Sequence, residues 1–123
     1  MKKVGRENTA PELAVRRYLH ACGLRFRVHD ARLPGRPDIV LARRHSVVFV
    51  HGCFWHGHGC AHGKVRAKTN IAYWDAKIHE NRARDARKRR ALLQLGWKVE
   101  TIWECQAGAG RSLAALAWRL LNR

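Results

Sequence analysis

Apolar residues recur every three or four positions near the start of the chain, and this spacing predicts a helix. The apolar positions are Leu13, Ala14, Tyr18, Leu19 and Cys22. Thr9 and Glu12 stand three residues apart just before them, which is the spacing of a capping box. Gly23 is suited to the end of the helix. Because Cys22 falls on the apolar face, we expect it to lie in the core.

Short apolar runs predict three strands after this helix. In residues 24–28 apolar side chains alternate with arginines, as in a strand with one buried face. Residues 39–41 and 47–50 are continuously apolar, which is typical of strands buried on both faces. Because only five residues separate these two runs, we expect neighbouring antiparallel strands. Residues 33–37, with two prolines and a glycine, predict the turn that precedes them.

In the middle of the chain, the pattern of short apolar runs gives way to a loop and a long polar helix. Residues 51–68 are rich in Gly, His and Cys and show no hydrophobic period, so they predict a loop. Residues 70–95 contain neither Gly nor Pro and predict a long helix that ends at Gly96. The middle of this helix is very polar, so much of it must face solvent or a partner.

One more strand and one more helix complete the predicted order. Apolar and polar residues alternate in residues 97–103, and Ser112 can cap an amphipathic helix within residues 107–123. The element order is then α-β-β-β-α-β-α, an α/β fold in which helices flank a mixed central sheet. The length supports a single domain over residues 1–123, with residues 1–8 as a flexible arm.

Charge points to a polyanionic partner. The chain has 25 Lys+Arg against 9 Asp+Glu, a formal net charge of +16, and nucleic acid is the first candidate to relieve this repulsion. A merely solubilising surface needs less charge of one sign. One short segment holds six of the basic residues: Arg82, Arg84, Arg87, Lys88, Arg89 and Arg90. No apolar run approaches the ~20 residues of a membrane span. Since the first residues do not resemble a signal peptide, we expect a cytoplasmic protein with reduced cysteines.

Three cysteines and a histidine have the spacing of a metal site. Cys53, His58 and Cys60 lie within eight residues, and Cys105 follows the last predicted strand. Such a set suits tetrahedral zinc, which would tether a loop that lacks an apolar period. The alternative is buried cysteines beside loop histidines. The further histidines, any one of which could replace His58 as a ligand, are His51, His56 and His62.

Asp38 is the acidic residue whose position favours a catalytic metal. It follows the predicted turn and opens a strand, so its carboxylate would stand at the mouth of the sheet, where a divalent ion can bind. A turn aspartate bonded to nearby backbone is the alternative. His51 and His56 flank the cysteine-rich loop, and an imidazole there can take a proton from water or simply support the loop.

Two aromatic pairs fall outside the regular apolar pattern. Phe54 and Trp55 lie in the Gly/His loop, and aromatic side chains in a basic setting can stack on bases or wedge between them. Trp74 follows Tyr73 at the start of the long basic helix, where it can do the same or anchor the core. The tryptophans that we expect in the core are Trp97, Trp103 and Trp118.

These strings of residues together resemble the very-short-patch repair (Vsr) DNA mismatch endonucleases. The resemblance rests on Leu-Pro-Gly-Arg-Pro-Asp at residues 33–38, on residues 48–58 with His-Gly-Cys-Phe-Trp-His at their centre, and on Trp-Glu-Cys at residues 103–105. It runs from about Thr9 to Cys105 in the same order. It implies a fold like that of type II restriction endonucleases and a Mg²⁺-dependent nick 5′ to the thymine of a T·G mismatch, the product of 5-methylcytosine deamination.

The resemblance also implies roles for individual residues. Asp38 corresponds to the metal-binding aspartate, and Val50 to a position whose backbone carbonyl helps to hold the metal. His56 corresponds to the general base, with His51 and Glu12 as supporting residues. The second acidic residue and the lysine that related nucleases carry are absent around residues 48–50, and a histidine base suits such a site.

Further roles follow from the same resemblance. The structural zinc ligands would be Cys53, His58, Cys60 and Cys105. The aromatics that wedge into the duplex would be Phe54, Trp55 and Trp74. The implied partners are mismatched double-stranded DNA, mismatch-repair proteins and a cytosine methyltransferase system, and the implied state is a monomer. Val50 replaces the threonine of some members, and the segments before Thr9 and after Cys105 are short.

Three alternatives stay open on the sequence. The first is a nuclease of the same fold with a different mismatch or sequence specificity. The second is a non-catalytic zinc module that binds DNA, against which Asp38, His51 and His56 argue because a pure binder needs none of them. The third is a basic RNA-binding protein, which would bind single strands without metal-dependent cleavage.

Overall fold

This computed structural model describes residues 8–53 and 71–122. At the centre of this part of the chain lies a mixed four-stranded sheet. The strands are β1 (Arg27–Val28), β2 (Ile39–Leu41), β3 (Ser46–His51) and β4 (Lys98–Trp103). They lie in the order β1-β2-β3-β4, antiparallel except for the parallel pair of β3 and β4. A parallel pair needs a crossover connection, and the long helix provides it.

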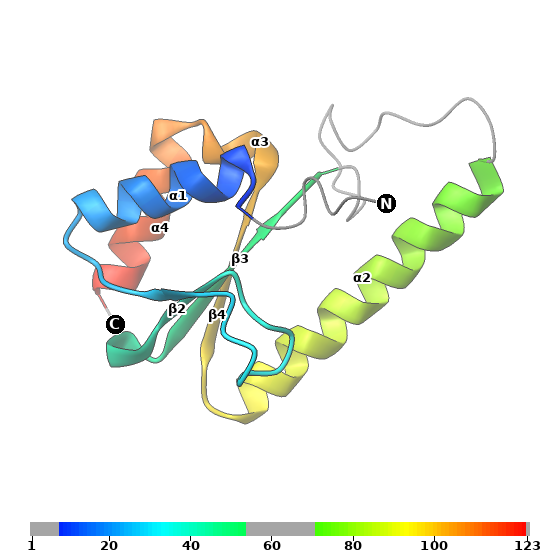
Figure 1. Ribbon diagram of the computed structural model, residues 1–123, viewed down its shortest axis with the longest axis horizontal. Coiled ribbons are helices and arrows are strands. Elements are labelled where there is room, and N and C mark those ends of the chain that lie inside the picture. Colours follow the sequence, from blue (N-terminus) through cyan, green and yellow to red (C-terminus); the bar gives the residue numbers. More distant parts are fainter. Residues whose placement is uncertain (1–7, 54–70, 123) are drawn as a thin grey trace.

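Helices cover both faces of the sheet (Figure 1). The helices are α1 (Ala10–Ala21), α2 (Ile71–Gln94), α3 (Glu104–Ala107) and α4 (Gly110–Leu121), and a 3-10 turn, η1 (Ala42–Arg44), joins β2 to β3. The larger core cluster lies between one face of the sheet and the helices α1, α3 and α4. The smaller cluster includes Leu92 of α2 and lies on the other face. The result is a mixed α/β fold in three layers.

The apolar run of β3 is explained by burial on both faces. Val48 belongs to the larger cluster, whereas its neighbours Val47 and Phe49 belong to the smaller one. Successive side chains of a strand point to opposite faces, so a strand between two layers needs apolar residues at every position. The predicted antiparallel pairing of this strand with β2 is confirmed, with Ile39 opposite Val48.

The first helix confirms its predicted start and its predicted end at Gly23, which follows the last turn with a φ of +91°, but not the predicted place of Cys22. The Thr9 hydroxyl accepts a hydrogen bond from the Glu12 backbone N–H at 3.3 Å, as a helix cap does. The Glu12 carboxylate does not complete a capping box, because it points into the site described below. Cys22 is exposed, so its expected place in the core was wrong. It follows the last helical turn, where the helical period no longer sets its direction.

Several other expectations need correction. The first strand is only two residues long, and Val28 is exposed because β1 lies at the edge of the sheet. The last helix begins at Gly110 after Ala109, so Ser112 lies inside it and does not cap it. Trp118 is 66% exposed on that helix, so its core assignment was wrong. The element order gains η1 and the one-turn helix α3.

Gly23 and Gly110 offer a clean test of backbone strain. Gly23 has a φ of +91°, whereas Gly110 does not have a positive φ, and no atom lies within 4 Å of a Cβ built at either position. We expect Gly23→Ala to cost roughly 1–2 kcal/mol from strain alone. We expect Gly110→Ala to stabilise by about 0.5 kcal/mol, because it restricts the unfolded chain. Denaturant midpoints measure both, and shifts of the same sign would contradict this reading.

Within the described residues, no helix is both long enough and apolar enough to cross a bilayer.

Candidate active site

Two carboxylates and an imidazole converge where α1 meets the start of β2. Glu12 lies in the first turn of α1, His29 follows β1, and Asp38 precedes β2. One ligand atom from each residue lies within 4.8 Å of the others. His29 Nε2 is 2.9 Å from Glu12 Oε2 and 3.8 Å from Asp38 Oδ1. The cluster therefore joins three segments that are up to 26 residues apart in sequence.

The backbone of β3 fixes the Asp38 carboxylate. The Val50 N–H donates a hydrogen bond of 2.7 Å to Asp38 Oδ2. The pairing of Ile39 with Val48 brings these two residues together, because antiparallel register places residue 38 beside the end of β3. One carboxylate oxygen is thus committed to the backbone. The other, Oδ1, faces His29 and is left for a ligand.

Glu12 is held between two basic side chains. It is 2% exposed, and its Oε2 accepts from Arg16 Nη2 at 2.9 Å. His29 Nε2 lies 2.9 Å from the same oxygen, so its N–H donates a hydrogen bond to the Glu12 carboxylate. The 3.4 Å approach of Arg16 to His29 is then a contact between two donors and not a hydrogen bond. Carboxylate and guanidinium compensate each other in this buried place.

Burial raises the pKa of Asp38 to about 6. The nearby Glu12 charge raises it further, whereas the Val50 hydrogen bond and the charges of His29 and Lys88 lower it. A carboxyl with a raised pKa has lost hydration that a cation would replace. The side chain is still 17% exposed, so a ligand can reach it.

The raised pKa of Asp38 predicts a pH-dependent stability. Between the unfolded pKa of 3.8 and about 6, the folded protein holds more protons than the unfolded chain, so stability falls as pH rises through this window. Asp38→Asn removes the buried charge, and we expect it to stabilise the protein by about 2 kcal/mol at pH 8 without added divalent metal. The gain should vanish near pH 4. Thermal unfolding at both pH values measures it, and an equal gain at both would exclude this cause.

His51 lies at the end of β3 beside α2. Its Nδ1 is 4.0 Å from Asp85 Oδ2, and its ring packs edge-on against Trp103 at 5.1 Å between centroids. Its side chain is 12% exposed. The sheet and α2 therefore hold the imidazole in place, near Asp38 in the fold because Val50 is its neighbour in β3.

Two of the four expected zinc ligands are described, and the fold brings their segments together. His51 pairs with Trp103 in parallel register, and Cys53 and Cys105 each follow two residues later. The Cys53 N–H donates to Glu104 Oε1 at 3.2 Å, which ties the two segments directly. Cys53 is buried, and Cys105 is half-buried in α3. His58 and Cys60 lie outside the described residues.

Of the other residues expected in the site, most lie outside the described residues and Trp74 lies within them. His56, Phe54, Trp55 and His62 lie outside the described residues. Trp74 is half-buried near the start of α2 and packs edge-on against the exposed Tyr73.

The sequence reasoning missed three residues of this site. It gave no role in the site to His29, Arg16 or Asp85. His29 has a φ of +46°, which is uncommon outside glycine, but no local sequence pattern indicates this. Arg16 follows Glu12 by four residues, and this i,i+4 spacing was an available signal.

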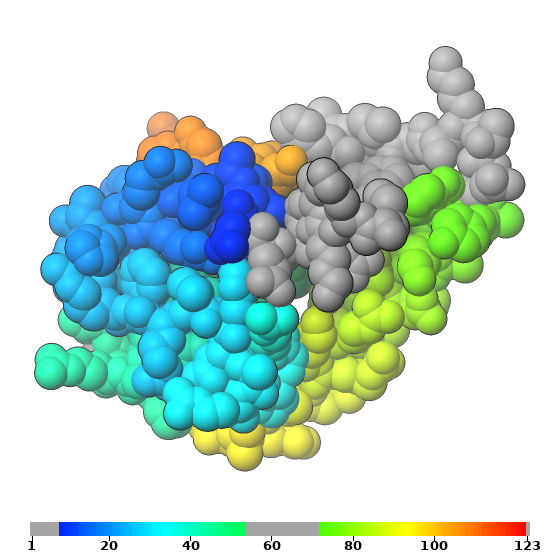
Figure 2. Space-filling model, viewed as in Figure 1, coloured from blue at the N-terminus to red at the C-terminus, as the bar shows by residue number. Residues whose placement is uncertain are grey.

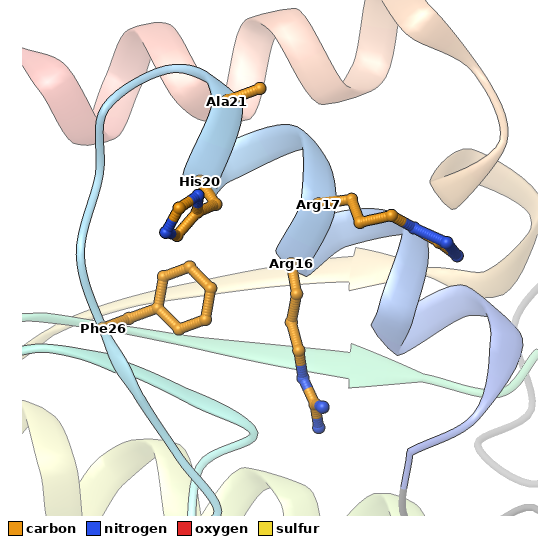
Figure 3. A pocket seen from close by; sticks show the side chains of 5 residues that line it. All are labelled: Arg16, Arg17, His20, Ala21 and Phe26. Atoms are coloured by element: carbon orange, nitrogen blue, oxygen red, sulfur yellow. The ribbon is translucent and has the colours of Figure 1, made fainter.

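A cavity of about 370 Å³ opens next to the site on α1. Figure 3 shows its lining: Arg16, Arg17, His20, Ala21 and Phe26. Arg16 therefore lines this cavity and also donates a hydrogen bond to Glu12. The cavity contains no carboxylate, so it does not form part of the metal-binding cluster.

Comparisons with known proteins agree on one class. A family model described as DNA mismatch endonuclease Vsr matches residues 1–62, which include Glu12, His29 and Asp38. The type II nicking enzyme V.XorIIP of Xanthomonas oryzae pv. oryzae is 52% identical over 122 residues, which are 99% of this chain and 87% of that protein. The DNA mismatch endonuclease Vsr of Escherichia coli is 46% identical over 105 residues, 85% of this chain and 67% of that protein.

A solved structure supports the fold. The catalytic domain of the homing endonuclease I-Bth0305I aligns with a TM-score of 0.57, covering 94% of this chain and 93% of that domain. At 16% sequence identity, this likeness shows a shared fold.

Proposed function

The chain belongs to the family of Vsr DNA mismatch endonucleases, and we propose that it nicks double-stranded DNA 5′ to the thymine of a T·G mismatch. Cleavage of DNA follows from the family. The mismatch, the side of the nick and the choice of metal are the proposal. The observation that carries it is the partly buried Glu12–His29–Asp38 cluster, which lies inside the segment that the family model matches.

The donor set fits a hard divalent cation. Asp38 offers the oxygen that Val50 does not occupy, and Glu12 adds a second carboxylate nearby. Oxygen ligands of this kind suit Mg²⁺, which retains positions for phosphate and water. We assign Asp38 and the Val50 carbonyl as direct ligands, with Glu12 and His29 as supporting groups. When bound, Mg²⁺ polarises the phosphoryl oxygen and stabilises the leaving oxyanion.

In this proposal, a histidine accepts the proton of the attacking water. His56 is the general base that takes a proton from the attacking water, and His51 supports it from β3. A neutral imidazole is suited to that task near neutral pH. The approach of Asp85 and Trp103 to His51 fixes the orientation of the supporting ring. A new bond forms between the water oxygen and phosphorus as His56 takes the proton of the water, the bond from phosphorus to the leaving sugar oxygen breaks, and that oxygen takes up a proton from solvent.

A structural zinc would hold the loop that carries the base and the wedge. Cys53, His58, Cys60 and Cys105 are the proposed ligands, and the tie between Cys53 and Glu104 supports the pairing of the two segments. Phe54, Trp55 and Trp74 would enter the duplex beside the mismatch, where unstacking costs least. A monomeric, cytoplasmic enzyme that works with mismatch-repair proteins and a cytosine methyltransferase completes the proposal.

The test is a nicking assay on labelled duplexes that differ by one base pair. With Mg²⁺, a duplex with a single T·G pair should be cut 5′ to the thymine, whereas the matched T·A and C·G duplexes stay intact. Several flanking sequences should be included, because the relative V.XorIIP is named a type II nicking enzyme. Cleavage of matched duplexes at the same rate would overturn the mismatch specificity and favour a nuclease of different specificity.

A further inference from the structure

Lys88 reaches the candidate active site from α2, on the face of the sheet opposite α1. It is half-buried, and Leu92 one helical turn later is fully buried in the smaller core cluster. Its stem packs on the turn before Asp38: a Cβ built on Gly35 would lie 2.7–2.9 Å from the Cβ, Cγ and Cδ atoms of Lys88. The cyan turn and the yellow-green part of α2 lie side by side in Figures 1 and 2.

This packing restrains the side chain close to the carboxylate cluster. The turn continues through Pro37, which is fully buried, directly into Asp38. The charge of Lys88 is near enough to lower the pKa of Asp38. Within the described part of the chain, the Lys88 ammonium makes neither a hydrogen bond nor an ion pair within 4.0 Å. The ammonium of this half-buried residue, close to the carboxylate cluster, is therefore available to a substrate phosphate.

The other cation of the site is already engaged. Arg16 donates a hydrogen bond to the buried carboxylate of Glu12. Strand β3 supplies no lysine, since its last residues are Phe49, Val50 and His51. Strand β3 therefore provides no positive charge beside the reacting phosphate, whereas α2 provides Lys88.

We propose that Lys88 contacts a non-bridging oxygen of the phosphate that is cut and stabilises the charge that develops there, in the place of a lysine from the sheet. This inference rests on phosphodiester cleavage at Asp38 as proposed above. Lys88 contributes charge only, while the bond from water oxygen to phosphorus forms and the bond to the leaving sugar oxygen breaks. A fixed positive charge at such a position strengthens its interaction as the transition state forms.

The test compares three variants of the full chain. Lys88→Met keeps the stem on Gly35 but removes the charge, and Lys88→Arg keeps the charge. Arg89→Met removes the same charge from the next, exposed position of α2 and measures the general loss of attraction to DNA. In single-turnover nicking at saturating protein, we expect Lys88→Met to be about 100-fold slower than wild type. Lys88→Arg should recover most of the rate, and Arg89→Met should lose much less than Lys88→Met.

Mn²⁺ binding without DNA provides a second readout that does not depend on the substrate. Because Lys88 repels a cation near Asp38, Lys88→Met should tighten Mn²⁺ binding about threefold or more, with a smaller effect for Arg89→Met. Equal effects of the two variants in either assay would overturn the proposal. If wild type binds Mn²⁺ but does not nick the T·G duplex, the proposed substrate fails, and the Mn²⁺ comparison still decides whether Lys88 acts at Asp38.

Discussion

Asp38→Asn should abolish nicking while DNA binding persists. The variant keeps the volume of the side chain and an oxygen that can accept from the Val50 N–H. It loses the negative charge that holds the divalent ion, and metal stabilisation of the transition state amounts to several kcal/mol. We therefore expect a loss of about 10³-fold or more in the single-turnover rate. Affinity for DNA should stay equal or rise, because a carboxylate repels phosphate.

The measurement needs a control for charge alone. Glu80→Gln removes one carboxylate from α2, where Glu80 is exposed and pairs with Lys77. It should nick at nearly the wild-type rate. Asp38→Asn within tenfold of wild type would place the metal elsewhere. Together with its expected stabilisation at pH 8, the variant would also show that this buried carboxylate is retained for activity at a cost in stability.

Glu12→Ala should be among the most destabilising single substitutions in the chain. It leaves Arg16 and His29, 16% and 11% exposed, beside each other without the carboxylate that they share. Breaking a buried charge pair by removing one partner costs about 3–5 kcal/mol. Denaturant unfolding measures the loss, and Glu12→Gln should lose less because its amide oxygen can still accept a hydrogen bond.

A double variant shows how much of the stability lost in Glu12→Ala comes from the uncompensated charge of Arg16 and how much from lost packing. Glu12→Ala combined with Arg16→Met removes the cation that the first substitution strands, so the pair should be more stable than Glu12→Ala alone. If Glu12→Ala costs less than about 1 kcal/mol, the carboxylate does not compensate Arg16 in the folded protein. Strict additivity of the two substitutions would lead to the same conclusion.

The sequence by itself determined the longer elements, their order and the class of protein. The length and apolar pattern of residues 70–95 are sufficient to specify α2, and the double burial of β3 is visible in its continuous apolar run. Motif strings around Asp38 and Cys53 indicated the family, which the comparisons confirm. These properties are local, because helical period, strand alternation and motif spacing depend on residues close together in the chain.

Only the tertiary structure decided which side chains share the site. Glu12 has the spacing of a capping box, yet its carboxylate turns to His29, whose position depends on the turn after β1. The exposure of Trp118 likewise follows from how the last helix lies on the sheet. Lys88 meets the turn at Gly35 across 53 positions of sequence. Contacts of this range carry no periodic signal, since they are set by strand register and helix packing rather than by neighbouring residues.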